Sequence, residues 1–455
     1  MGNGEDRKVK DMTAGNPFRL ILLFALPMMA GNLFQQLYTV VDTMIVGQGV
    51  GVGALASLGA ADWLVWLYYG LAMGLTQGFS ILYSQEFGAG DYAGLRRTVG
   101  NSVLLTALIA VSFELIGQAT VLPVLKLLDT PAEILPGAEL YLRVILAGLP
   151  VSLFYNLTSS LLRALGNSRV PLYAMVTATL LNIGLDLLFV LVFRWGIGGA
   201  AAATILAQAA AGTICFLVVR KIELLKLTKE DLRFEKARAG KLIRIGIPLS
   251  LQNSIIALGG MVLQRVINGF GVVFVAGFVA TNKMYGLLET AAISYGYAVT
   301  TYVAQNFGAG KTERIRKGMV SAFFMAVLTS LAVSSLMLLF GREVLKLFIE
   351  KDAADYDAVL GIAWQYLRIM AYFLSTLYIL YVFRSGLQGL GDTLMPMVSG
   401  IVEFLMRSGA ALVLPRFMGE QGIYYAEILA WSGAAVFLTA AYFLRVRSMK
   451  RKGHL

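Results

Sequence analysis

Long apolar stretches separated by short polar segments run along the chain from residue 18 to residue 446. Each stretch is close to or above the length of about 20 residues that an α-helix needs to cross a bilayer. The pattern predicts twelve membrane-spanning helices, at 18–46, 54–84, 95–119, 134–161, 170–193, 198–220, 241–270, 274–304, 314–340, 358–387, 394–415 and 421–446. We therefore expect an all-α membrane protein.

The basic residues predict how these helices are oriented. Most of the 38 Lys and Arg residues lie near the N-terminus, in the loops after even-numbered stretches, or near the C-terminus. Because basic residues concentrate on the cytoplasmic side of membrane proteins, both termini are predicted to be cytoplasmic. The net charge of +11 then follows from membrane topology, and we expect no nucleic-acid partner.

The chain also contains an internal repeat. The segment Gln85–Gly90 reads QEFGAG after the second stretch, and Gln305–Gly310 reads QNFGAG after the eighth. Pro27 in the first stretch has a counterpart in Pro248 in the seventh. Since each copy holds six helices, both copies have the same orientation, as in transporters built from parallel repeats. The predicted parts are a cytoplasmic tail (1–16), an N-lobe (17–220), a cytoplasmic linker (221–240), a C-lobe (241–446) and a second tail (447–455).

Composition argues against an enzyme. Hydrophobic residues make up 58% of the chain and charged residues 14%, with one cysteine and one histidine. Gly310-Lys311-Thr312 resembles the end of a phosphate-binding loop, but Gln305 stands where that motif needs a glycine, and no strand precedes it. No nucleophile–base pair or metal cluster is evident. We expect no catalytic activity and no cofactor other than a coupling ion.

Several of these features together resemble the multidrug and toxic compound extrusion (MATE) family. They are the 6+6 repeat, Pro27 with Asp42 fifteen residues later, the paired FGAG loops, and Asn182-x-x-x-Asp186. The acidic pattern resembles the DinF-like bacterial branch. The resemblance implies two pseudo-symmetric six-helix bundles that form a V-shaped central cleft and work by alternating access. It also implies export of organic, often cationic, amphipathic drugs or metabolites in exchange for H⁺ or Na⁺. We expect a monomer in the plasma membrane of a bacterium or archaeon, with membrane lipid as a further partner.

The acidic residues of the N-lobe are the main candidates for function, since a carboxylate inside a membrane helix is costly. Counting along the predicted helices places Asp42, Tyr141, Asp186 and Thr204 at similar depths in the outer half of the N-lobe. Asn182 lies one turn from Asp186 on the same helix face. Burial beside a second carboxyl favours the protonated form, whereas the same oxygens are hard donors that suit Na⁺. The sequence does not decide whether the bound cation is H⁺ or Na⁺.

The resemblance assigns roles to these residues. It implies a cation site, for H⁺ or Na⁺, at Asp42, Asn182, Asp186 and Thr204, a proton-sensitive hydrogen bond at Tyr141, and a further network position at Asn156. Pro27 is expected to bend the first helix and couple it to the cleft. The competing interpretation is that Asn182 and Asp186 only join helices by hydrogen bonds. At the repeat offsets Asp42 and Asp186 correspond to Leu263 and Ala411, so the C-lobe lacks the pair.

The C-lobe has intramembrane charges of its own: Arg265, Lys283, Glu289, Arg368, Glu403 and Arg407. Glu403 is expected to pair with Arg407 four residues later, and Glu289 with Lys283. The alternative is that Glu289 forms a C-lobe cation site. The four basic residues also keep open a lipid-linked oligosaccharide or lipid flippase of the same superfamily. A channel or sensor fits the 6+6 repeat less well. The basic segment Arg220–Arg244 is expected to be a solvated linker, with contact to anionic lipid headgroups as the alternative.

Overall fold

The computed structural model describes residues 9–128, 130–349 and 355–451, and these residues form helices and no β-strand. The first half contains α1 (Pro17–Gly49), α2 (Val52–Gly88), α3 (Tyr92–Leu127), α4 (Leu135–Ala147), α5 (Leu149–Ala164), α6 (Arg169–Asp186), a π-helix (Leu187–Val192), α7 (Gly196–Val219) and a short 3-10 turn (Glu223–Leu225). The second half contains α8 (Lys236–Asn268), α9 (Val272–Gly308), α10 (Thr312–Leu345), α11 (Tyr356–Gly389), α12 (Leu394–Val413), α13 (Pro415–Met418), a 3-10 turn (Gly419–Ile423) and α14 (Tyr424–Arg451).

The predicted all-α membrane fold is confirmed, because each of the twelve apolar stretches is helical. Within the described ranges, nine helical runs are long and apolar enough to cross a membrane, and the bent pair α4–α5 makes a tenth. One of these runs, Leu394–Arg451, holds both α12 and α14, and α2 is a helix that lies outside the nine. The bend of 45° between α4 and α5 lies beside Pro150, which supplies no N–H for a helix hydrogen bond.

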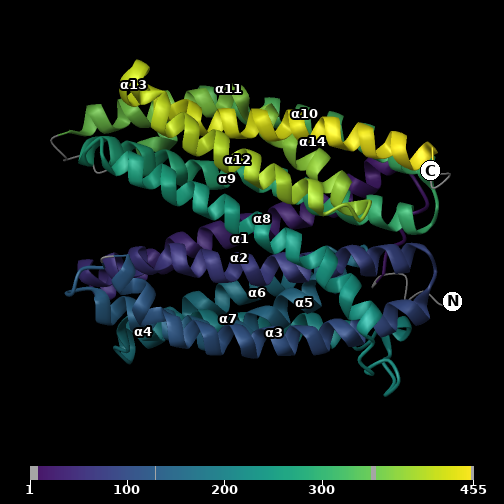
Figure 1. Cartoon of the computed structure of the whole chain (residues 1–455). Helices are drawn as coiled ribbons and strands as arrows, with labels where there is room; N and C mark the ends of the chain where they lie inside the picture. The colour runs from purple at the N-terminus through teal and green to yellow at the C-terminus, as the bar shows by residue number, and fades with distance from the viewer. Residues whose placement is uncertain (1–8, 129, 350–354, 452–455) are drawn as a thin grey trace. The chain divides into compact units, whose positions relative to one another are not determined.

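The helices group into two compact units (Figure 1). Unit 1 contains Leu26–Ser250 and the described residues up to Ala14, and unit 2 contains Gly15–Ala25 and the chain from Leu251 onward. The division falls inside α1 beside Pro27 and inside α8 beside Pro248. The units therefore differ from the sequence repeats, because unit 2 includes the first part of α1 and unit 1 includes the first part of α8. Unit 1 is held by contacts among α2 to α7, and unit 2 chiefly by α9 to α12 and α14.

Aromatic rings fill the interior of unit 2. Tyr366 on α11 stacks against Phe278 on α9 at 5.0 Å between ring centroids and against Tyr424 on α14 at 5.5 Å. Tyr285 and Trp431 form another stacked pair, at 5.8 Å. Large buried rings supply much apolar contact area, and offset stacking adds about 0.5–1.5 kcal/mol per pair. The core of unit 2 thus fixes α9 against α11 and α14.

The linker of unit 1 is hydrogen-bonded to the helices at several points, although most of its side chains are exposed as a solvated linker requires. Arg238 at the start of α8 donates to Glu86 at 3.1 Å and to the Thr98 hydroxyl at 2.9 Å. The Asn101 side chain donates to the Arg233 carbonyl at 3.2 Å and accepts from the Glu235 amide at 2.8 Å. These hydrogen bonds join residues that are far apart in the sequence. The sequence of the linker alone, which is polar and basic, therefore did not predict them.

Candidate functional site

Two aspartates from different helices of unit 1 meet in its interior. Asp42 comes from the part of α1 in unit 1, and Asp186 is the last residue of α6. Their carboxyl groups lie within hydrogen-bonding range of each other, and such a bond requires a proton on one of them because an ionised carboxylate only accepts. Asp186 is fully buried, and one oxygen of each aspartate is buried without a hydrogen-bond partner in the described part of the chain. The pair is therefore largely desolvated.

Asn182 and Thr204 connect this pair to α7. With the Asn182 amide in the orientation that satisfies both of its groups, its nitrogen donates to Asp186 Oδ2 at 2.8 Å and its oxygen accepts from the Thr204 amide at 3.1 Å. The Thr204 hydroxyl donates to the Ala200 carbonyl at 3.1 Å and lies 3.0 Å from the Tyr38 hydroxyl. Tyr38 is one turn before Asp42 on α1. Two adjacent α1 side chains thus join the same network.

The structure places Tyr141 beside this network as well. It lies on α4, within electrostatic range of Asp42, and packs against the apolar cluster that contains Val46 and Val190. The structure therefore brings together Asp42, Asn182, Asp186, Thr204 and Tyr141, as the sequence predicted. Their assigned roles in cation binding stay predictions.

A π-helix follows the acidic residue directly, which the sequence did not predict. Leu187–Val192 continues α6 with the wider π geometry, and the Phe193 amide donates to the Leu188 carbonyl at 2.8 Å. Such segments are rare and occur frequently at functional sites. Gly49, at the end of α1, packs on it so closely that a Cβ atom would lie 2.5 Å from Leu191 Cδ2. The end of α1 and the π-helix are therefore in direct contact.

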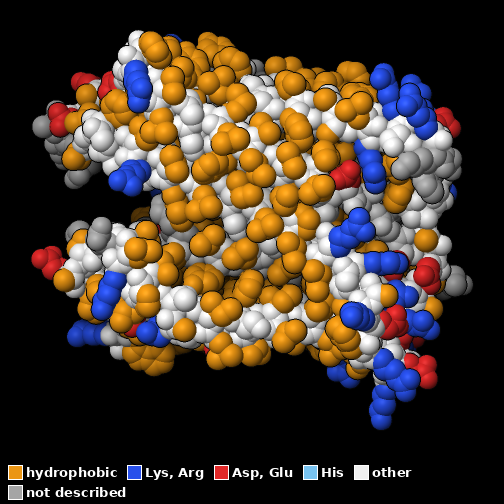
Figure 2. Space-filling view, in the orientation of Figure 1, with side chains coloured by type: hydrophobic (Ala, Val, Ile, Leu, Met, Phe, Trp, Pro, Cys, Tyr) orange, Lys and Arg blue, Asp and Glu red, His pale blue; other side chains and the backbone are white. Residues whose placement is uncertain are grey.

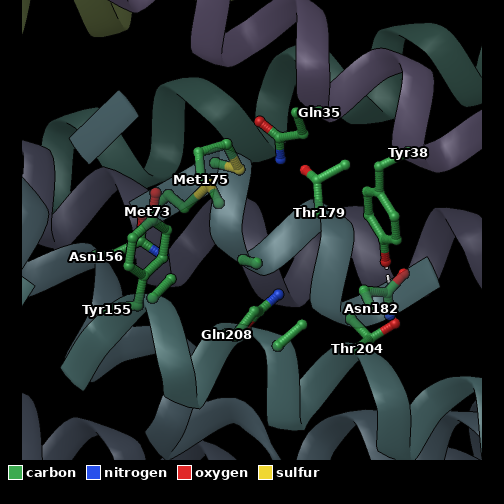
Figure 3. A pocket seen from close by; sticks show the side chains of 13 residues that line it. Gln35, Tyr38, Met73, Tyr155, Asn156, Met175, Thr179, Asn182, Thr204 and Gln208 are labelled. Atoms are coloured by element: carbon green, nitrogen blue, oxygen red, sulfur yellow. Dashed lines mark hydrogen bonds between the residues drawn. The ribbon is translucent and has the colours of Figure 1, made fainter. Parts of the chain in front are cut away.

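A cavity of about 60 Å³ adjoins the polar network inside unit 1 (Figure 3). Asn182, Thr204 and Tyr38 lie at one end of it, and Met73, Tyr155 and Asn156 lie at the other. The remaining lining residues are Gln35, Met175, Ala178, Thr179, Ala207, Gln208 and Ala211. The lining mixes amides, hydroxyls, an aromatic ring and methionines.

Asn156 belongs to this cavity rather than to the aspartate pair. Its amide nitrogen donates to the Ser152 carbonyl one turn earlier, at 2.9 Å. Gln35, Tyr38 and Gln208 also line the cavity and were missed by the sequence analysis. Their spacing gave a signal, since Gln35 lies three residues before Tyr38 and Gln208 four residues after Thr204, which places each pair on one helix face.

The charges of unit 2 pair differently from the prediction. Arg384 on α11 pairs with Glu403, and Arg407 donates to Glu427 on α14 at 2.8 Å, so the expected Glu403–Arg407 pair is wrong. Both partners come from neighbouring helices, which the i, i+4 argument did not consider. All four side chains are at most 15% exposed.

Glu289 also lacks its predicted partner. Its carboxylate accepts from the Tyr381 hydroxyl at 2.7 Å and from Tyr285, and the described residues show no ion pair between it and Lys283. Residues six positions apart point about 120° away from each other around a helix, since neighbours on a face are three or four apart. Lys283 is accordingly exposed. Whether Glu289 binds a cation stays a prediction.

Comparison with known proteins accounts for the repeat and the fold. The sequence model of the MatE family matches twice, at residues 27–188 and 248–410. The chain is 30% identical over 440 residues to the probable multidrug resistance protein YpnP of Bacillus subtilis, covering 96% of this chain and 97% of that protein. It is 26% identical to the probable multidrug resistance protein YoeA of the same organism, over 77% of this chain and 78% of that one.

The solved structures agree at the level of the fold. A MOP superfamily transporter from Pyrococcus furiosus superposes with a TM-score of 0.91 at 24% identity, over 99% of both chains. A family match over most of the chain, a 30% identical relative of nearly the same length and a shared fold lead to one conclusion. The chain belongs to the MatE family and is a multi-pass membrane transporter, not an enzyme.

Proposed function

We propose that this transporter is a secondary active antiporter that exports organic, often cationic, amphipathic compounds in exchange for H⁺ or Na⁺. The observation that carries the proposal is the Asp42–Asp186 pair, whose carboxyl groups lie within hydrogen-bonding range of each other and are buried next to a mixed polar and apolar cavity in unit 1. The names of the relatives YpnP and YoeA, which describe probable multidrug resistance proteins, support the same substrate class.

The aspartate pair is suited to bind and release a cation. Two carboxyl groups in contact cannot both ionise without an added positive charge, because their charges repel in a desolvated site. One proton satisfies the pair, and removing it leaves a site for another cation. The carboxylate oxygens of Asp42 and Asp186 would serve Na⁺, a hard cation, equally well, and the Asn182 and Thr204 oxygens could join them once Asn182 turns its oxygen from the Thr204 amide towards the pair. The residues therefore support exchange coupled to either ion.

The cavity is suited to varied organic compounds. Met73 and Met175 are flexible and polarisable, and the Tyr155 ring offers a face that attracts cations. Pockets that enclose drug-sized molecules measure about 300–1,000 Å³, so a cavity of about 60 Å³ must widen before it can hold one. We propose that the cavity expands during the transport cycle.

α1 is the element that links the two sites. Gln35 and Tyr38 line the cavity, Asp42 belongs to the acidic pair, and all three follow Pro27 on α1. Proline removes one helix hydrogen bond and lets the helix bend there. Cation entry at the pair would change the contacts of Asp42 and Tyr38, shift this part of α1, and narrow the cavity so that the drug leaves outward. Alternating access in the plasma membrane, with both termini in the cytoplasm and a monomer as the working unit, completes the proposal.

A lipid-linked oligosaccharide or lipid flippase is the second candidate. It is favoured by Arg265, Lys283 and Arg368, which are exposed on helices of unit 2 and would attract a pyrophosphate. It is weakened by Arg407, whose charge is already neutralised by Glu427.

Transport by the purified protein in liposomes tests the proposal. Vesicles are given only a pH gradient, only a Na⁺ gradient, or neither, and movement of ethidium and of norfloxacin is followed by fluorescence. We expect one gradient to drive transport and the other to have little effect. If neither gradient moves any tested compound while a labelled lipid-linked saccharide crosses the bilayer, the flippase assignment replaces the antiporter.

A further inference from the structure

The linker between α7 and α8 presents apolar side chains to the outside although its backbone is fixed. Leu232 is 43% exposed and Phe234 is 61% exposed. The Arg233 carbonyl and the Glu235 amide on either side of Phe234 are both hydrogen-bonded to Asn101 of α3. Because these bonds hold the backbone, the two side chains cannot simply turn inward. Their exposure is built into the fold.

This part of the linker lies at the edge of the apolar surface of α3. The Asp231 carbonyl is so close to Gly100 that a Cβ atom there would lie 2.0 Å from it. Gly100 is eight residues into α3, roughly 12 Å at 1.5 Å per residue, and α3 is one of the membrane-crossing helices. Val103 and Leu104, in the next turn, are exposed apolar residues. The apolar outer surface of α3 therefore continues into Leu232 and Phe234.

The charges around these side chains are mostly positive. The acids Asp231 and Glu235 are neutralised internally, by Arg96 at 3.7 Å and by Arg238 at 2.8 Å. Lys229, Arg233 and Lys236 are exposed and form no ion pair within the described residues. In Figure 1 the linker is the teal loop turned outward at the lower right, and Figure 2 shows blue Lys and Arg atoms together with some red Asp and Glu atoms at the same place.

We propose that this segment is an interfacial anchor, consisting of Leu232, Phe234, Lys229, Arg233 and Lys236, that binds the anionic phospholipid surface of the cytoplasmic leaflet. Apolar side chains interleaved with basic ones suit the boundary between acyl chains and headgroups. The basic side chains bind headgroup phosphates, and each gains from the negative surface potential of that leaflet. Because α8 begins at Lys236 and Arg238 is held by Glu86, lipid binding here fixes the depth at which α8 begins.

Spin labels on single cysteines test the anchor directly. Cys215 is the only cysteine, so Cys215→Ser gives a background free of thiols. Nitroxide labels are placed separately at positions 232, 234 and 230, since Glu230 is exposed and polar. In liposomes that contain phosphatidylglycerol we expect the ratio of oxygen to nickel-chelate accessibility to be roughly threefold or more higher at 232 and 234 than at 230.

A matched pair of charge variants tests the lipid chemistry. K229Q/R233Q/K236Q removes three positive charges from the anchor, and R447Q/K450Q/R451Q removes three exposed ones from the end of α14. We expect the label at 234 to become water-accessible in the first variant and in pure phosphatidylcholine, and to keep its lipid exposure in the second variant. The proposal is overturned if position 234 is as aqueous as position 230 in phosphatidylglycerol vesicles, or if both triple variants give the same result.

Discussion

Units 1 and 2 both bury carboxyl groups, but the side chains that face these groups differ. In unit 2, Glu403 and Glu427 each face an arginine, and Glu289 accepts hydrogen bonds from two tyrosines. In unit 1, Asp42 and Asp186 face each other, and Asp186 also faces the Asn182 amide. Removing one partner of a buried ion pair is costly, so the unit 2 arginines stabilise a fixed arrangement. Under the proposed function, the aspartate pair instead takes its positive charge from a cation that enters from outside the protein.

The comparison suggests that the buried charges of the two repeats have different functions, one in stability and one in transport. The buried ion pairs of Glu403 and Glu427 hold helices of unit 2 together, whereas the Asp42–Asp186 pair of unit 1 is, under the proposed function, left for a mobile cation. Substitutions in unit 2 should then affect stability first, and substitutions in unit 1 should affect transport first. Four experiments can break or sharpen this distinction.

The largest effect is expected from Asp186→Asn. The amide keeps the size of the side chain but cannot be charged, so the pair can no longer exchange a cation. We expect ethidium efflux from bacteria that lack their major pumps to fall to the level of cells without the protein, with the amount of folded protein unchanged. Glu289→Gln in unit 2 is the control and should keep efflux. Equal loss in both variants would contradict the separation of tasks.

The next effect concerns the stability of unit 2. Arg407→Met leaves Glu427 buried without its partner, which should lower the free energy of unfolding by about 3–5 kcal/mol. The double variant R407M/E427L replaces both charges with apolar groups and should recover most of that loss. Thermal unfolding in detergent measures both. If the double variant is as unstable as the single one, the pair has a role beyond mutual neutralisation.

The sequence predicted that the two aspartates lie close together. Membrane topology determines how deep each residue lies in the membrane, and helix periodicity determines which face of its helix it occupies. Asn182 and Asp186 are one turn apart, and counting from the helix ends brought Asp42 and Thr204 to their level. The ion pairs of unit 2 escaped prediction because the rotation of α11 and α14 about their axes decides which charges meet. Arg384 and Glu427 were therefore overlooked as partners of Glu403 and Arg407.

The linker and the cavity also depend on contacts between helices that the sequence alone does not predict. A basic, polar segment reads as solvated, yet Asn101 and Arg238 fix it to α3 and α2 through contacts more than 100 residues apart in the sequence. The cavity lining includes Gln35 and Gln208, which are single polar residues in apolar runs. Only the helix packing shows that they face the same space.

A smaller difference in transport rate is expected between two Tyr→Phe variants, one in each unit. Tyr38→Phe removes the hydroxyl that contacts Thr204, at a cost of about 0.5–1.5 kcal/mol, and should slow transport because this bond joins α1 to α7. Tyr381→Phe removes a donor to the Glu289 carboxylate, at a cost of about 1.5–3 kcal/mol, and should leave transport nearly unchanged. Unfolding temperature and efflux rate are measured on both variants. A slower rate for Tyr381→Phe alone would reverse the assignment.

The smallest effect is expected in the linker. Asp231 is buried, which raises its pKa, but hydrogen bonds from Thr228 and the charges of Arg96 and Arg97 outweigh burial and hold the pKa below the usual 3.8. A lowered pKa means that the ionised form stabilises the fold above pH 3.8 and that this contribution is lost as the pH falls through the lowered pKa. Asp231→Asn should therefore speed hydrogen exchange of the linker amides at pH 7.

As the pH falls through the lowered pKa, the exchange rates of wild type and Asp231→Asn should converge once the intrinsic rate is corrected for. Linker amides that exchange equally in both proteins at pH 7 would show that the ionised carboxylate does not hold the segment.

The π-helix after Asp186 has a consequence for how this family can change in evolution. A π-turn accommodates one residue more than an α-turn, because its hydrogen bonds join residues five apart instead of four. Because Leu187–Val192 lies downstream of Asp186, a gain or loss of one residue there is absorbed on the side away from Asn182. We expect relatives to differ in length by one residue at this place while their acidic residue keeps its helical register. The segment thus separates the acidic residue from the loop that leads into α7.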